Sequence, residues 1–188
     1  MTHQVIVTTE RLIVRTWKSS DYPVMEQINL DPKVMEYFPS IWLPERTRKF
    51  IDYLNAHQAR CGYTLFAVER RDTKMFIGFV GLNQVTFSIP HFHPVALPVV
   101  EIGWRLASDH WGMGFATEAA RSVLNHALTE LCLPEVIAFT AAPNQASQRV
   151  MQKIGMQRDP ASDFNHPALD IHSPLARHVL YRTGSVRG

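Results

Sequence analysis

Apolar residues recur at three- and four-residue steps through residues 115–131, and polar residues occupy the opposite side of the same stretch. This spacing predicts an amphipathic α-helix, and Pro134 lies just beyond its end. Similar but shorter patterns, with Ser, Asp, Asn or Pro near the first turn, predict four further helices. The first begins at residues 19–21 and runs to 29. The other three cover 31–37, 44–60 and 145–154. The last is capped by Asn144 and closed by Gly155.

Short runs rich in β-branched and aromatic residues alternate with these helices and predict strands. The expected strands are 5–14, with an irregularity near 8–10, and 64–69, 75–84, 95–106, 136–140 and 177–181. Gly78 and Gly81 would let the third strand bend or approach a neighbour closely. Two prolines within 90–94 place that stretch in a loop. The order predicts a mixed α/β domain with a largely antiparallel early sheet, in which the later helices act as crossovers.

Composition narrows the class of protein. The 188 residues suit one domain over 1–188, and 46% hydrophobic with 19% charged residues is typical of a globular chain. A net charge of +2 implies neither nucleic acid nor an acidic membrane as partner. Arg46, Arg48 and Lys49 fit one solvated helix face. Two isolated cysteines, no signal-like N-terminus and no apolar run of membrane-spanning length predict a cytoplasmic protein.

The chemistry is concentrated where the strand 95–106 leads through a short loop into the helix at 115. Gly112 and Gly114 let the main chain approach a ligand, and the first N–H groups of the helix have no intrahelical partner. These groups and the helix dipole favour an anion such as a pyrophosphate. A P-loop is excluded because Phe115 and Ala116 stand where Lys and Ser/Thr are needed. The dinucleotide fingerprint, and with it a nucleotide-dependent oxidoreductase, fits poorly because Thr117 replaces its last glycine.

The residues around the glycines carry a family resemblance. Glu-Ile-Gly-Trp at 101–104, followed by Trp-Gly-x-Gly-x-Ala-Thr-Glu-Ala at 111–119, resembles the acetyl-CoA segment of the GNAT superfamily. It is most similar to the RimJ/RimL-type branch, the ribosomal-protein N-acetyltransferase-like enzymes. Segments 9–15, 77–82 and 144–156 resemble other motifs of that branch in the right order. Trp111 stands where the wider superfamily often has Gln or Arg, which removes one polar phosphate contact.

The resemblance implies a GNAT fold, acetyl-CoA as cosubstrate without a metal, and direct acetyl transfer to an amine in a ternary complex. It also implies that the strand before the loop splays from its neighbour and leaves backbone groups free. The N–H of Ile102 or Gly103 would then polarise the thioester carbonyl. The residues expected to bind the cosubstrate are Ile102, Gly103, Trp104, Leu106, Trp111, Gly112, Met113, Gly114, Phe115, Ala116, Thr117 and Asn144.

Two side chains are candidates for proton transfer. Glu101 begins the cosubstrate segment and is the first candidate for general base, acting directly or through a water. Its alternative is a strand carboxylate paired with an arginine. Ser147 shares a helix face with Asn144 and is a candidate to protonate or orient the leaving thiolate. The alternatives are an N-cap role for Asn144 and a solvated hydroxyl for Ser147.

The acceptor side is less specified. Trp42 belongs to a region that usually caps the acceptor in this family, although each of its aromatic residues also suits a core. His93 lies in a loop that would line the acceptor cleft, and its His-x-His spacing lacks the further ligands of a zinc site. His166 lies close to Asp163 in the last long connection. Together they would form a base-like or substrate-facing pair, or simply order the turn.

The sequence therefore predicts an acetyl-CoA-dependent N-acetyltransferase acting on a primary amine, either the N-terminal α-amine of a protein or a small molecule. The alternative is a non-catalytic acyl-CoA-binding or sensing module on the same fold. No nucleic-acid or membrane partner is expected, and the resemblance allows a monomer or a homodimer.

Overall fold

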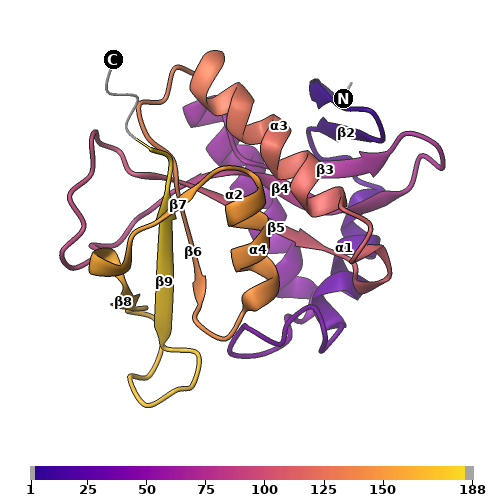
Figure 1. Cartoon of the computed structure of the whole chain (residues 1–188). Coiled ribbons are helices and arrows are strands. Elements are labelled where there is room, and N and C mark those ends of the chain that lie inside the picture. Colours follow the sequence, from indigo (N-terminus) through magenta and orange to yellow (C-terminus); the bar gives the residue numbers. More distant parts are fainter. Residues whose placement is uncertain (1–2, 185–188) are drawn as a thin grey trace.

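The computed structural model describes residues 3–184 and forms one twisted, open sheet with helices on both faces (Figure 1). Within that range the sheet has nine strands in the order β1-β2-β3-β4-β5-β6-β9-β7, and β8 also pairs with β9. The strands are β1 (Val5–Thr8), β2 (Leu12–Arg15), β3 (Leu65–Arg70), β4 (Phe76–Gln84), β5 (Val100–Leu106), β6 (Ile137–Ala141), β7 (Gln157–Arg158), β8 (Phe164–Asn165) and β9 (Arg177–Arg182). The α-helices are α1 (Asp21–Leu30), α2 (Pro44–Cys61), α3 (Phe115–Thr129) and α4 (Gln145–Lys153).

The sheet confirms the predicted mixed α/β class. All neighbouring strands are antiparallel except β5 and β6, which are parallel and connected through α3. A parallel pair needs such a crossover, because the chain must return to the same end of the sheet. The helices α3 and α4 cover one face, and α1 and α2 cover the other (Figure 1). None of the described helices combines the length and apolarity that crossing a membrane requires.

Three predicted elements differ from the structure. The run 5–14 is a hairpin, β1 and β2, because the expected irregularity is the turn itself, where Thr9 N–H donates to Leu12 O at 2.9 Å. Residues 31–37 form turns rather than a helix. The strand expected from residue 95 begins at Val100, and Val95 instead donates its N–H to the side chain of Glu135 at 3.1 Å.

The glycines of β4 are required by close backbone packing. A Cβ atom on Gly81 would lie 2.1 Å from the carbonyl oxygen of Thr64, and one on Gly78 would lie 2.2 Å from that of Arg105. No side chain fits at such distances, so these positions keep β4 tightly packed against β3 and β5. The bend or close approach predicted from the sequence is confirmed at both glycines.

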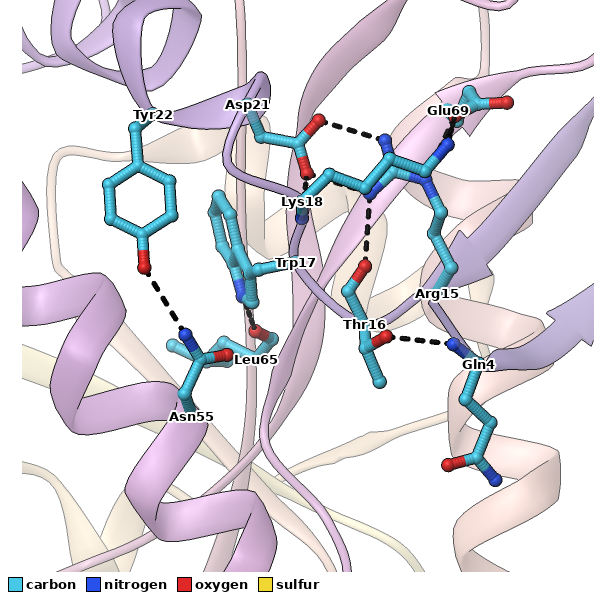
Figure 2. A network of polar contacts seen from close by, with 10 residues as sticks. All are labelled: Gln4, Arg15, Thr16, Trp17, Lys18, Asp21, Tyr22, Asn55, Leu65 and Glu69. Atoms are coloured by element: carbon cyan, nitrogen blue, oxygen red, sulfur yellow. Dashed lines mark hydrogen bonds and ion pairs between the residues drawn. The ribbon is translucent and has the colours of Figure 1, made fainter. Parts of the chain in front are cut away.

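A buried ion network joins the opening hairpin to α1 and β3 (Figure 2). The guanidinium of Arg15, only 1% exposed, binds both oxygens of Asp21 at 2.7 and 2.8 Å and Oε2 of Glu69 at 2.8 Å. Lys18 Nζ reaches the same Glu69 oxygen at 2.9 Å. Burial by itself would raise the pKa of Glu69, but the hydrogen bonds from Lys18 and Arg15 lower it overall. The network fixes the start of α1 against the sheet. The other end of α1 contacts β5, where Asn29 accepts a hydrogen bond from Arg105 at 2.6 Å.

Candidate functional site

The free edge of β5 toward β6 is the first feature of the site. These two strands pair only at Glu101 and Ile137, and they diverge beyond that point. Ala107 N–H donates to Ile77 O on β4 at 2.9 Å. Because backbone groups alternate in direction along a strand, the N–H and C=O groups of Ile102, Trp104 and Leu106 face β6. The same alternation directs the Gly103 N–H toward β4, and it leaves the Ile102 N–H to the single pairing with Ile137. The Trp104 N–H is therefore better placed to serve a ligand in the gap.

The loop after β5 ends at an uncapped helix terminus. Gly112 and Gly114 have φ values of 75° and 82°, in the left-handed region that favours glycine, and Gly114 is the N-cap of α3 without a side-chain cap. A Cβ atom on Gly112 would meet nothing within 4 Å, so the main chain is open to a ligand there. Phe115 is buried, which leaves its backbone N–H as the group it can offer. This geometry suits an anion.

Trp111 has a structural role in this loop. Its Nε1–H donates to the carbonyl oxygen of Leu106 at 2.9 Å, although 46% of the residue is exposed. The indole therefore ties the loop to the end of β5. Because this hydrogen bond uses the Leu106 carbonyl, the backbone group that Leu106 can offer to a ligand is its N–H. The residue that departs from the wider superfamily thus holds the loop in place by a contact within the protein.

Arg11 is a residue of this region that sequence reasoning missed. From the β1–β2 turn it donates to the Met113 carbonyl at 2.9 Å and pairs with Glu118 at 2.6 Å. Its guanidinium also lies 4.6 Å from the ring centre of Phe115. An arginine–glutamate ion pair therefore ties the loop and the first turn of α3 to a distant segment. Thr-Glu-Arg in the opening motif was visible in the sequence, but the hairpin that brings it here was not.

Glu101 lies at the point where β5 and β6 separate. Its Oε1 accepts from Asn83 Nδ2 at 3.4 Å, and Asn83 Oδ1 accepts from Tyr53 Oη at 3.3 Å. Burial raises the pKa of Glu101 to about 7, and the Asn83 hydrogen bond lowers it only partly. No arginine pairs with Glu101 within residues 3–184, so the alternative of a strand ion pair is not realised. A carboxyl that titrates near neutrality suits proton abstraction.

Asn83 and Tyr53 were also missed by sequence reasoning. Asn83 is the direct partner of Glu101 in the antiparallel pairing of β4 and β5, so correct register would have identified it. Tyr53 comes from α2 and is 41% exposed, and only the packing of that helix brings it close. The three side chains form a polar line from the surface of α2 to the strand edge.

Residues of α4 are engaged within the protein. Asn144 caps the helix, because its Oδ1 accepts from Ser147 N–H at 3.1 Å, and its Nδ2 donates to Thr140 Oγ1 at 3.0 Å. The N-cap alternative is therefore realised, and a contact to the cosubstrate remains a prediction. The Ser147 hydroxyl makes no hydrogen bond within the described chain. Tyr181 is 2% exposed beneath α4, where its hydroxyl contacts Gln148 and Gln152.

The three residues expected on the acceptor side contact different neighbours. Trp42 packs between α1 and α2 against Phe50, with ring centres 5.1 Å apart. The ring centres of His166 and Phe87 lie 4.9 Å apart, in an aromatic group that includes Phe139, Phe164 and His178. His93 is exposed, and its carbonyl accepts from Arg182. No contact joins these three within the described residues.

The expected pair of Asp163 and His166 does not form. Asp163 instead binds Arg158 and accepts from Leu180 N–H at 3.1 Å, because both partners lie on the strands beside it. His166 Nδ1 accepts from Ala168 N–H at 3.2 Å, and burial lowers its pKa. His166 is therefore a neutral member of the aromatic group around Phe87 and is not half of an acid–base pair. In the part of the chain that is described, no three His, Cys, Asp or Glu residues come together as metal ligands.

Comparison with known proteins agrees with this geometry. The acetyltransferase (GNAT) domain family matches residues 11–157. The uncharacterized N-acetyltransferase YnaD of Bacillus subtilis (strain 168) is 30% identical over 154 residues, which cover 81% of this chain and 83% of that protein. The GNAT-family acetyltransferase structure from Bacillus anthracis superposes with a TM-score of 0.74 at 26% identity, covering 94% and 96% of the two chains.

A further structural likeness is to RimL, the ribosomal L7/L12 alpha-N-protein acetyltransferase in complex with coenzyme A. It has a TM-score of 0.75 at 17% identity and covers 95% of this chain and 97% of that one. The similarity is one of fold. With the family match spanning most of the chain and the splayed strand and loop present, this protein belongs to the GNAT family and is an acetyl-CoA-dependent acetyltransferase.

Proposed function

We propose that the protein transfers the acetyl group of acetyl-CoA to a primary amine by direct attack in a ternary complex. The observation that carries the proposal is the Glu101 carboxyl, whose pKa of about 7 places a titrating base at the edge where β5 leaves β6. An α-amine with a pKa of ~7.7–8.0 is already partly neutral at pH 7, so such a base suffices to complete its deprotonation.

The residues present fit the cosubstrate. The outward C=O of Ile102, the outward N–H and C=O of Trp104 and the N–H of Leu106 would hold the pantetheine in the gap between the strands. The loop at 111–114 and the first N–H groups of α3 would hold the pyrophosphate. Asn144 and Phe115 are expected, from the family resemblance, to contact the same cosubstrate. The other expected contacts of the loop, Met113, Ala116 and Thr117, stay predictions of the family resemblance.

The reaction needs one proton removed from the amine and one delivered to the leaving sulfur. The acceptor amine gives a proton to Glu101 as its nitrogen bonds to the acetyl carbon, and the carbon–sulfur bond breaks as the thiolate leaves. The N–H of Trp104 would stabilise the oxyanion of the tetrahedral species. The leaving thiolate takes a proton from the surrounding water or from Ser147, whose hydroxyl is free within the described chain. Tyr181 is unsuited to that role because it is buried under α4.

The acceptor is either a protein N-terminus or a small amine. The likeness to RimL favours an N-terminal α-amine, whereas a net charge of +2 provides no strong surface field for a ribosomal partner. A cytoplasmic location and a monomeric or homodimeric state are further predictions.

Thiol release from acetyl-CoA tests the proposal against a panel of N-terminal peptides, polyamines and amino acids. Wild type and Glu101→Gln are compared, with coenzyme A affinity measured by calorimetry for both. We expect turnover on at least one acceptor, loss of turnover in the variant and unchanged affinity for coenzyme A. Tight coenzyme A binding without turnover on any amine would favour the alternative, a non-catalytic acyl-CoA-binding or sensing module.

A further inference from the structure

Arg105 is a buried cation without a counter-charge. It is 6% exposed, and Nη1 donates to Asn29 Oδ1 at 2.6 Å, but its Nε has no hydrogen-bond partner and no carboxylate pairs with it among the described residues. Burial lowers the pKa of Arg105 to about 9, and the nearby charge of Arg46 adds to the effect. A buried guanidinium is ordinarily paired, because its desolvation is costly. An unpaired one therefore points to a missing anion.

Aromatic rings surround this guanidinium. Its Cζ atom lies 4.1 Å from the ring centre of Phe38, 4.4 Å from Trp42 and 5.4 Å from Phe79. Ring faces attract a cation, but they supply no negative charge. The indole Nε1–H of Trp42 is likewise buried without a partner. Two unused donors thus lie close together, and Arg46 approaches Trp42 at 4.4 Å.

Arg105 shares a face of β5 with Glu101. Side chains alternate along a strand, so Glu101, Gly103 and Arg105 point to the side covered by α1 and α2. A Cβ atom on Gly103 would meet only Leu65 Cδ2, at 3.7 Å, so the stretch between the two charged residues carries no side chain. The base candidate and the guanidinium therefore lie on one face of β5 with only Gly103 of this strand between them.

We propose that Arg105 and the indole of Trp42 bind the carboxylate of an amino-acid-like acceptor whose amine faces Glu101. A guanidinium fork matches a carboxylate in shape and charge, and the indole N–H supplies a further donor. Phe38, which is 37% exposed at the end of the turns after α1, is the ring that moves to admit the ligand. The inference rests on the proposed function, since it names the acceptor class of the same site.

Matched acceptors test the proposal. Thiol release from acetyl-CoA is measured with free alanine, methionine and phenylalanine, each beside its carboxamide, which keeps the size and removes the negative charge. We expect wild type to favour the acid at least tenfold in kcat/KM. Arg105→Gln should abolish that preference through the KM of the acid, and Trp42→Phe, which keeps the ring, should reduce it several-fold.

Lys49→Gln is the matched control, because it removes one exposed cation from α2 and should leave the preference unchanged. A merely structural role for Arg105 predicts equal losses for acid and amide together with a lower melting temperature. That result, or equal kcat/KM for acid and amide in wild type, would overturn the proposal. If Arg105→Gln does not fold, Trp42→Phe decides the question by the same ratio.

Failure of the proposed function would be distinguishable. If wild type acetylates neither member of any pair, the acetyl-transfer proposal is at fault, and the carboxylate site is judged by binding alone. Calorimetry then compares N-acetylmethionine with its carboxamide on protein saturated with coenzyme A. Tighter binding of the acid, lost in Trp42→Phe, supports the carboxylate site, and equal affinities refute it.

Discussion

Replacing Glu101 with glutamine removes a charge that the fold tolerates at a cost. In the folded protein its pKa is about 7, compared with an ordinary value of 4.5. Between these two values the unfolded chain releases the proton and the folded protein keeps it, so stability falls as pH rises through this window. Above pH 7 the full cost is present, and at ~1.4 kcal/mol per pH unit it amounts to roughly 3 kcal/mol.

The neutral amide of Glu101→Gln avoids the cost of burying a charge, but it cannot act as a base. We expect Glu101→Gln to be more stable than wild type by up to about 3 kcal/mol at pH 8 and nearly equal to it at pH 4.5. Its turnover should fall by about 10²- to 10⁴-fold. In wild type, kcat/KM should rise with pH with a midpoint near 7, and that limb should be absent from the variant, which retains only the ionisation of the amine.

Urea unfolding at pH 4.5, 6 and 8 measures the first effect, and initial rates over the same range measure the second. Glu130→Gln is the control, since Glu130 is an exposed carboxylate at the end of α3. A stability difference that does not change with pH would refute the buried-charge reasoning. Equal pH profiles for wild type and Glu101→Gln would refute the assignment of the base.

Four further substitutions test the scaffold and the loop. Gly112→Ala and Gly62→Ala both place a side chain at positive φ, 75° and 81°, so each should cost about 1–2 kcal/mol, but only Gly112→Ala should weaken coenzyme A binding tenfold or more by calorimetry. Gly81→Ala should lower stability by at least about 1–3 kcal/mol in urea unfolding, because its Cβ would lie 2.1 Å from the carbonyl oxygen of Thr64. Arg15→Met leaves two buried carboxylates short of their partner and should cost about 3–5 kcal/mol; a loss below 1 kcal/mol would contradict the role given to this network.

The sequence predicted most accurately the elements whose own pattern determines them. The helix expected at 115–131 is α3, Phe115–Thr129, and that at 145–154 is α4, Gln145–Lys153, with Asn144 as its cap. Periodic apolar positions and caps act within a few residues, so no knowledge of the rest of the fold is needed. The phosphate-binding character predicted for the loop is local in the same way, because two glycines and a helix terminus are adjacent in the chain.

Errors arose where distant contacts decide the conformation. Asp31 was expected to open a helix, but its Oδ1 accepts from Lys33 N–H and its Oδ2 accepts from Ser108 Oγ, so its carboxylate serves a turn and a contact to the loop after β5. Val95 and Leu97 have strand-like character but are 55% and 81% exposed. Their hydrophobicity misled the prediction of where β5 begins, because none of the described strands pairs with them.

The two sides of β5 explain why one part of the candidate site could be predicted from the sequence and the other could not. The proposed cosubstrate side, which is the outward backbone of β5 and the loop that follows it, comes from one continuous segment. The proposed acceptor side combines Tyr53 of α2, Asn83 of β4 and Glu101 and Arg105 of β5, and its register and packing are set by the whole sheet. Arg105, the residue proposed to bind a carboxylate, has no motif that distinguishes it from a surface arginine. Its burial and its unused donor identify it, and both are properties of the folded chain alone.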